Sequence, residues 1–151
     1  MDNNEYFMSK AILEAKKAFK KDEAPIGAVI VKDGVIISKA HNLRETKNNA
    51  LYHAEILAID KACKKLGSWR LVDCDLYVTL EPCLMCAGAI MQARVKNVFF
   101  GASDPKGGAF GSSINLNEIK TINHHPNITC GILKDECSQL LKDFFKKKRE
   151  K

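Results

Sequence analysis

Two cysteines, Cys83 and Cys86, have the spacing that most directly suggests chemistry. Three positions apart at the start of a helix, their sulfurs lie near one face, and the positive end of the helix stabilises thiolates there. Two neighbouring thiolates suit tetrahedral zinc coordination. Taken alone, the pair is equally compatible with a redox couple or with two small buried side chains.

A histidine and a glutamate could complete a zinc site. No second cysteine pair at zinc-knuckle spacing is present, so a third protein ligand must be of another type, and His53 is the candidate. Glu55 follows two residues later, and helix positions i and i+2 do not face each other. Both side chains can therefore address one metal only if the helix begins at about residue 53. Each residue alone is more often an ordinary surface or hydrogen-bonded side chain.

An open coordination position follows from three protein ligands, and it is typical of catalytic zinc. Two thiolates and a neutral imidazole balance the charge of Zn²⁺, which still lowers the pKa of a bound water. Glu55 can then take the proton of the water and return it to the substrate and to the leaving ammonia. We expect His53, Cys83 and Cys86 as the ligands of one zinc ion per subunit, with Glu55 as the catalytic residue.

The joint spacing is more specific than any of its parts. His-x-Glu, about 26 further residues and Pro-Cys-x-x-Cys form the known signature of zinc-dependent nucleobase deaminases, a class that includes tRNA adenosine deaminases. Over nearly its whole length the sequence resembles the family of bacterial tRNA-specific adenosine deaminases. The resemblance is carried by these stretches: residues 23–29, 41–42, 53–55, 79–89 and 101–106, and the Phe144-Phe145 pair with its basic tail.

The resemblance implies a fold, an activity and a partner. The fold is a cytidine-deaminase-like, three-layer α/β/α sandwich around a mixed five-stranded sheet. The activity is hydrolysis of the wobble adenosine of a tRNA anticodon to inosine, with release of ammonia. The family works as a homodimer with its sites near the subunit interface, and its substrate is the tRNA anticodon stem–loop.

The resemblance also suggests substrate contacts. It places the base pocket near Ile26, Asn42 and the backbone at Ala54, and a loop with Asp104 and Lys106 near the RNA. The Asn42 amide can donate to and accept from a purine edge. An Asn in a loop equally often satisfies its own neighbouring backbone.

A basic balance of charge is consistent with an RNA partner. The 151 residues carry a formal net charge of +6, and a basic run lies near the end of the chain. Such a run releases counterions when it neutralises phosphates. Between residues 142 and 151 the basic residues are Lys142, Lys146, Lys147, Lys148, Arg149 and Lys151.

The cysteine usage and the apolar pattern suggest a cytoplasmic protein. The first ten residues lack the apolar core of a secretion signal, and the longest apolar stretch, residues 83–91, is too short to cross a bilayer. Six cysteines in a chain of this size are more typical of metal binding or catalysis than of disulfides. We expect no membrane association.

Alternating patterns predict one α/β domain over residues 1–151. The Asp33-Gly34 pair between two apolar runs predicts a hairpin, which makes the sheet mixed. Gly67 is expected to end a helix. No element is assigned to residues 102–126. The predicted helices cover residues 8–19, 53–66, 83–93 and 134–148, and the predicted strands residues 26–31, 35–40, 76–80, 98–101 and 128–131.

Three alternatives stay open at this point. The zinc signature does not separate deamination of tRNA from deamination of a free base or nucleoside such as guanine or cytosine. A zinc-stabilised binding module would have no need of Glu55. A thiol redox enzyme would use Cys83 and Cys86 without a metal.

Overall fold

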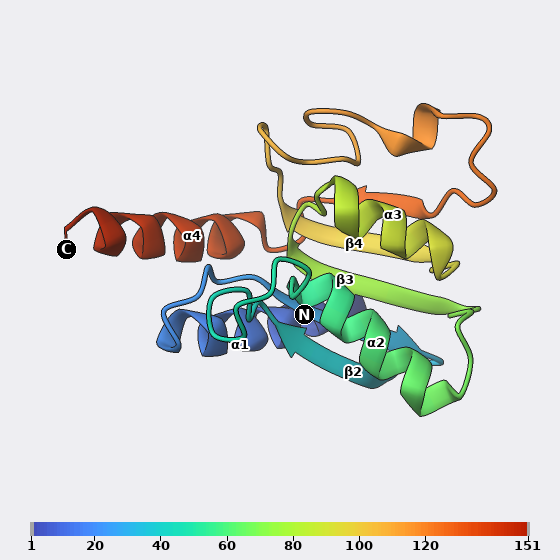
Figure 1. Ribbon diagram of the computed structural model, residues 1–151, viewed down its shortest axis with the longest axis horizontal. Coiled ribbons are helices and arrows are strands. Elements are labelled where there is room, and N and C mark those ends of the chain that lie inside the picture. Colours follow the sequence, from blue (N-terminus) through green and yellow to red (C-terminus); the bar gives the residue numbers. More distant parts are fainter. Residues whose placement is uncertain (1, 151) are drawn as a thin grey trace.

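A computed structural model describes residues 2–150 of the chain (Figure 1). Most helix and strand bounds lie within two residues of the predicted ones, which is the usual uncertainty of element ends. In chain order the elements are α1 (Asn3–Lys20), β1 (Gly27–Lys32), β2 (Val35–His41), α2 (Ala54–Leu66), β3 (Cys74–Leu80), α3 (Leu84–Gln92), β4 (Asn97–Ala102), β5 (Asn127–Cys130) and α4 (Lys134–Arg149).

One mixed five-stranded sheet forms the centre, in the order β2-β1-β3-β4-β5. The predicted hairpin is confirmed: β1 and β2 are antiparallel, and Lys32 pairs with Val35 across a two-residue turn. Asp33 and Gly34 both have positive φ, +51° and +76°, as the tight turn of a twisted hairpin requires. β3 runs parallel to β4, and β4 runs parallel to β5.

Helices cover both faces of the sheet, so the predicted three-layer sandwich is confirmed. On one face, α2 and α3 bury small and aliphatic side chains, such as Ala58 and Ile90, against strand residues that include Ile30 and Val78. On the other face, α1 packs Met8 and Ala11 against Val29 and Tyr77, and α4 contributes Cys137 to the same cluster. Figure 1 shows α2 and α3 in front of the sheet, with α4 extending away from its edge.

α1 begins five residues before the predicted start. Its first turn is secured by a capping box in which the Asp2 side chain accepts from the Glu5 N–H and the Glu5 side chain accepts from the Asp2 N–H. The apolar periodicity starts only at Met8, whereas the polar cap is what fixes the helix N-terminus.

Of the unassigned residues 102–126, Ala102 ends β4, and residues 103–126 form an ordered connection with one short 3₁₀ helix, Leu116–Glu118. Among residues 2–150, no helix combines the length and apolar character that crossing a membrane would need. The basic run continues α4 as predicted, except that Lys151 lies outside the described residues.

Candidate active site

His53 occupies the N-cap of α2 in an extended conformation, with φ −75° and ψ 155°. Its carbonyl already accepts the first helical hydrogen bond, from the Leu57 N–H at 3.1 Å. The predicted helix start at residue 53 is therefore confirmed. Because the backbone at His53 is not yet helical, its side chain and that of Glu55 can approach one site.

Cys83 occupies the N-cap of α3 in the same manner, with φ −74° and ψ 176°, and Cys86 lies in the first turn. Pro82 precedes the cap, and its carbonyl accepts from the Ala109 N–H at 2.9 Å. The two helix N-termini converge from neighbouring positions on the same face of the sheet. Partial positive charge at both termini favours thiolates between them.

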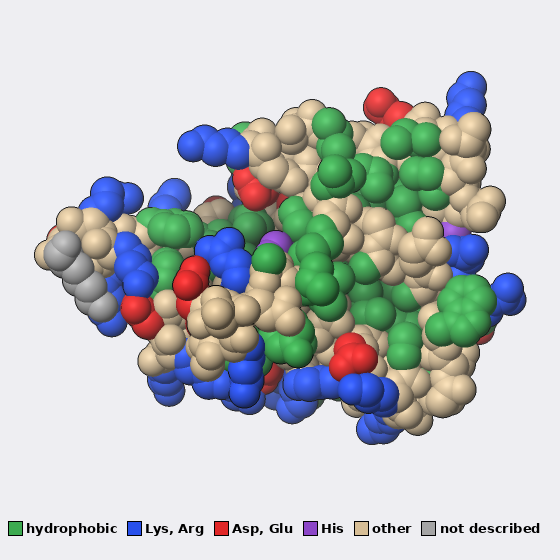
Figure 2. All heavy atoms as spheres, viewed as in Figure 1, with side chains coloured by type: hydrophobic (Ala, Val, Ile, Leu, Met, Phe, Trp, Pro, Cys, Tyr) green, Lys and Arg blue, Asp and Glu red, His purple; other side chains and the backbone are tan. Residues whose placement is uncertain are grey.

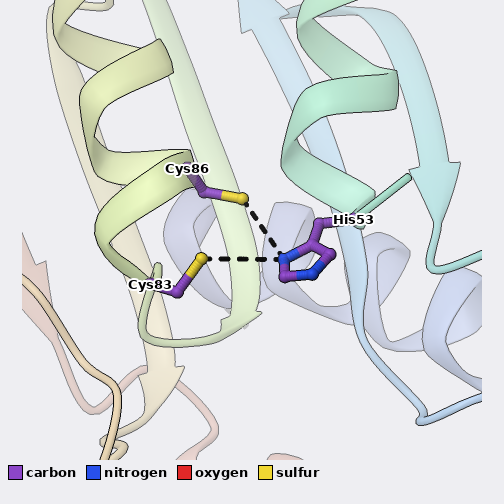
Figure 3. Close-up of side chains that lie close together, drawn as sticks. All are labelled: His53, Cys83 and Cys86. Carbon is purple, nitrogen blue, oxygen red and sulfur yellow. Dashed lines mark hydrogen bonds between the residues drawn. The ribbon is translucent and has the colours of Figure 1, made fainter. Parts of the chain in front are cut away.

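The three predicted ligands meet. The Nδ1 atom of His53 lies 3.6 Å from the Sγ atoms of both Cys83 and Cys86 (Figure 3). Zinc bonds of about 2.3 Å to sulfur and about 2.0 Å to nitrogen, at a tetrahedral angle, place such atoms about 3.5 Å apart. The three ligand atoms lie within 4.8 Å of one another, so distances and donor types fit one zinc ion.

The three ligand side chains shift one another's pKa values. The hydrogen bond from the Cys86 thiol, together with that to His53 and against the effect of burial, lowers the pKa of Cys83 to about 4. The same contact with Cys83, followed by burial, raises the pKa of Cys86. The hydrogen bond with Cys83 also raises the pKa of His53, although burial opposes it. A metal cation bound at this position would favour the deprotonated form of both thiols.

Glu55 is buried beside the three ligands, with 4% of its surface exposed. Burial is the main reason that its pKa rises to about 7; a hydrogen bond from its own backbone N–H opposes the rise and the Cys83 thiolate adds to it. A carboxyl group with a pKa near the working pH can both accept and donate a proton. The predicted catalytic residue therefore has the environment that this role requires.

A cavity of about 770 Å³ opens next to His53. Its lining includes Ile26, Asn42 and Ala54, so the predicted base-pocket residues are gathered at one place. The Asn42 Oδ1 accepts from the Arg44 N–H at 3.1 Å, and its Nδ2 donates to the Ala24 carbonyl at 3.4 Å. The amide is thus hydrogen-bonded to backbone groups near the cavity.

A second cavity, of about 600 Å³, is lined by Asp104 and Lys106. The Asp104 carboxylate accepts from the backbone N–H groups of Lys106 and Gly107, both at 3.2 Å, which shapes a tight turn. Ala24, Ile26 and Phe145 line both cavities, so the two adjoin each other.

Sequence reasoning does not identify two buried carboxylates, Glu23 and Glu81, which hold the loops beside the cavities. Glu23 is fully buried and accepts from the backbone N–H groups of Glu45 and Thr46 at the edge of the first cavity. Glu81, with 2% exposure, plays the corresponding part for the loop at the second cavity. For Glu81, the signal in the sequence is an acidic residue directly after an apolar strand, where burial of a carboxylate is unusual.

The sequence matches the MafB19-like deaminase family over residues 1–149. The tRNA-specific adenosine deaminase of Bacillus subtilis (strain 168) is 53% identical over 151 residues, which are 100% of this chain and 94% of that protein. The chain belongs to the tRNA-specific adenosine deaminase family. Its His53, Cys83 and Cys86 cluster is the candidate metal site of a family member.

Solved structures agree with this assignment. A structure from studies of A-to-I editing by tRNA:A34 deaminases at the wobble position of transfer RNA has a TM-score of 0.88 and 45% identity, covering 90% of this chain and 99% of that one. A guanine deaminase from Bacillus subtilis has a TM-score of 0.65 and 42% identity, with coverage of 80% and 77%. The chain is thus more similar in structure to the tRNA deaminase than to the guanine deaminase.

Proposed function

We propose that the protein is a zinc-dependent hydrolytic deaminase that converts the wobble adenosine of a tRNA anticodon to inosine. The observation that carries this proposal is the meeting of His53, Cys83 and Cys86 beside the buried Glu55, at the edge of a cavity large enough for a nucleobase. The names of the family relatives supply the substrate.

His53, Cys83 and Cys86 would hold one zinc ion per subunit. When bound, zinc supplies a Lewis acid that makes water a competent nucleophile near neutral pH. The residues of the chain do the rest. Glu55 accepts a proton from the attacking water and delivers it to a ring nitrogen. It then passes the remaining proton of the added hydroxyl to the amino group, which leaves as ammonia. The carbon that loses the amino group gains the carbonyl oxygen of inosine.

The first cavity would bind the target base. Ile26 offers an apolar contact, Asn42 offers an amide and Ala54 offers backbone groups at the start of α2. The second cavity, with Asp104 and Lys106, would bind the adjoining RNA. The bases of an anticodon loop are already unpaired, so exposing one of them costs little free energy.

We further propose that the protein is a homodimer in the cytoplasm and that each subunit is a single domain over residues 1–151. Figure 2 shows hydrophobic side chains gathered on the face that carries α2 and α3, with basic groups around them. Leu84 at the start of α3 and Leu51 before α2 are 60% and 56% exposed. Exposed apolar side chains near a site are consistent with a subunit contact at this face. Light scattering of the purified protein measures the mass of the particle.

Incubation with a pool of tRNAs, followed by detection of inosine at anticodon positions, tests the proposal. We expect inosine at position 34 and nowhere else, accompanied by one ammonia per inosine. Ammonia from free guanine or cytosine without inosine in tRNA would instead support the free-base deaminase. Alkylation of Cys83 and Cys86 at equal speed before and after chelation would indicate that the thiols hold no metal, as in a redox enzyme.

A further inference from the structure

Glu81 is a buried carboxylate at a junction of the site. It follows the last residue of β3 and stands two residues before the ligand Cys83. Its backbone N–H donates to the Ala102 carbonyl at 2.8 Å, which continues the pairing of β3 with β4. Only 2% of its surface is exposed. A buried carboxylate without bonding partners would be strongly destabilising.

Within residues 2–150, the hydrogen-bond partners of the Glu81 carboxylate come from one loop, residues 104–112. Its Oε1 accepts from the Asp104 N–H at 3.1 Å and from the Ser112 hydroxyl. Its Oε2 accepts from the N–H groups of Phe110 and Ser112, both at 3.1 Å. Four donors separated by up to eight residues in sequence thus converge on one carboxylate.

The loop is shaped to fit this carboxylate. A Cβ atom added at Gly108 would lie 2.3 Å from the Glu81 Cδ and 2.5 Å from both carboxylate oxygens. No side chain is therefore tolerated at Gly108 while Glu81 keeps its four hydrogen bonds. The neighbouring Ala109 N–H donates to the Pro82 carbonyl at 2.9 Å, which adds a fifth tie between the loop and the start of α3.

This loop forms a wall of the second cavity, through Asp104, Lys106 and Gly107. The chain that holds the loop continues directly into the ligand Cys83. The carboxylate of Glu81 thereby sets the position of the loop relative to the three candidate ligands. Glu81 and the farthest of its partners, Ser112, are 31 residues apart in the sequence.

We propose that Glu81 is a positioning residue that holds loop 104–112 in the conformation that binds the RNA next to the target base. This inference rests on the proposed function. Glu81 acts through the loop and touches neither the base nor the metal ligands' sulfur atoms in this role. Its removal should weaken binding of the polynucleotide substrate and leave the chemical step at saturation intact.

The Glu81→Gln substitution tests this role with little change in size. Whichever way the amide points, its NH₂ group faces two of the four donors and accepts nothing from them. We expect KM for tRNA to rise at least about tenfold, with kcat within about twofold of the wild type. Zinc content should stay at the level of the wild type, because the ligands are unchanged.

Two further variants keep the test decisive if Glu81→Gln folds poorly. Gly108→Ala keeps the charge but displaces the carboxylate, and it should reproduce the rise in KM. Ser112→Ala removes one donor of four and should raise KM about threefold. Ser113→Ala is the matched control: within residues 2–150 its hydroxyl has no hydrogen bond to Glu81, and its kinetics should match the wild type.

Hydrogen exchange supplies a measurement that is independent of activity. The N–H groups of Asp104, Phe110 and Ser112 should exchange at least about tenfold faster in Glu81→Gln than in the wild type. A fall in kcat with unchanged KM would show a general structural role and overturn the inference. So would unchanged exchange and unchanged KM. A wild-type protein that forms no inosine would refute the proposed function, whereas the exchange result would still test the anchoring of the loop.

Discussion

The candidate metal cluster and the loops that line the two adjoining cavities differ in what holds them in place. On one side, the ligands and Glu55 belong to the first turns of α2 and α3, two regular helices packed on the sheet core. On the other side, the loops that carry Arg44 and Asp104 have no regular structure. One buried carboxylate accepts several hydrogen bonds from each loop: Glu23 from the loop with Arg44 and Glu81 from the loop with Asp104.

This difference separates chemistry from recognition. The position of a helix N-terminus is determined by many packing contacts, so the removal of one ligand side chain leaves the others in place. The position of an anchored loop depends on a few hydrogen bonds and is sensitive to one substitution. The metal side should therefore respond to mutation in an all-or-none manner, and the loop side in a graded manner.

The largest effect is expected for Cys83→Ala, on the metal side. With two ligands left, the zinc content measured by elemental analysis should fall from one equivalent to near zero, and inosine formation should be lost. Cys130→Ala removes an exposed cysteine of β5 and serves as the control. Retention of a full equivalent by Cys83→Ala would show that the ligand set is wrong.

Glu55→Gln should separate metal binding from proton transfer on the same side. The amide keeps the shape of the buried side chain but takes no proton, so kcat should fall by about 10²–10⁴ while zinc stays bound. Single-turnover rates, with zinc content measured on the same sample, check the prediction. Activity near that of the wild type would remove Glu55 from its proposed role.

On the loop side, Glu23→Gln should cost stability in a manner that depends on pH. Burial favours the neutral acid, but the hydrogen bonds from Thr46 and Glu45 outweigh it and hold the pKa of Glu23 below its ordinary value of 4.5. Because the folded pKa is the lower one, the stabilisation is complete above about pH 4.5 and disappears as the pH falls through the folded value.

Urea unfolding at several pH values measures this effect. Glu23→Gln should lower the free energy of unfolding by about 1–3 kcal/mol at pH 7, and the difference should shrink as the pH falls below about 4. Glu45→Gln is the control, because that carboxylate belongs to the same loop but its side chain is 71% exposed. A difference that stays constant down to low pH would show that the Glu23 charge is not what anchors the loop.

The contrast between the two sides also explains what could be predicted from sequence. The element order follows from local periodicity, and the N-cap position of His53 follows from its separation of two residues from Glu55. These signals are short-range, so one sequence is sufficient to detect them. The sequence therefore predicted which side chains would approach one another, and the structure brings the three candidate ligands together.

The loop side gives few local signals. Residues 103–126 show no apolar periodicity. Their first part is held by hydrogen bonds to Glu81, which lies more than 20 residues earlier in the sequence. The Asn42 amide was predicted as a base contact, but its bond to the Arg44 N–H shows that the local use is available as well. The predicted start of α1 is too late because the apolar periodicity begins at Met8, whereas the capping box of Asp2 and Glu5 fixes the start of the helix. Long-range anchoring is what local spacing does not encode.

The smallest effect is expected at the basic end of α4, which borders the first cavity through Phe144, Phe145 and Lys148. Lys148 is paired with Asp22 at 2.6 Å, and the Lys147 ammonium lies 5.6 Å from the centre of the Phe19 ring. These contacts must be exchanged for phosphates, and an exposed ion pair contributes little free energy.

Replacing Lys147, Lys148 and Arg149 by alanine should therefore weaken tRNA binding by about tenfold at low salt, and it should flatten the plot of log K against log salt by about 1–2. Filter binding at several salt concentrations measures both. Alanines at Lys61, Lys64 and Lys65, near the far end of α2, remove the same charge and test whether position matters. Equal slopes for the two triple variants would mean that α4 attracts RNA only through net charge. A smaller slope for the α4 variant alone would place phosphates along this helix, next to the first cavity.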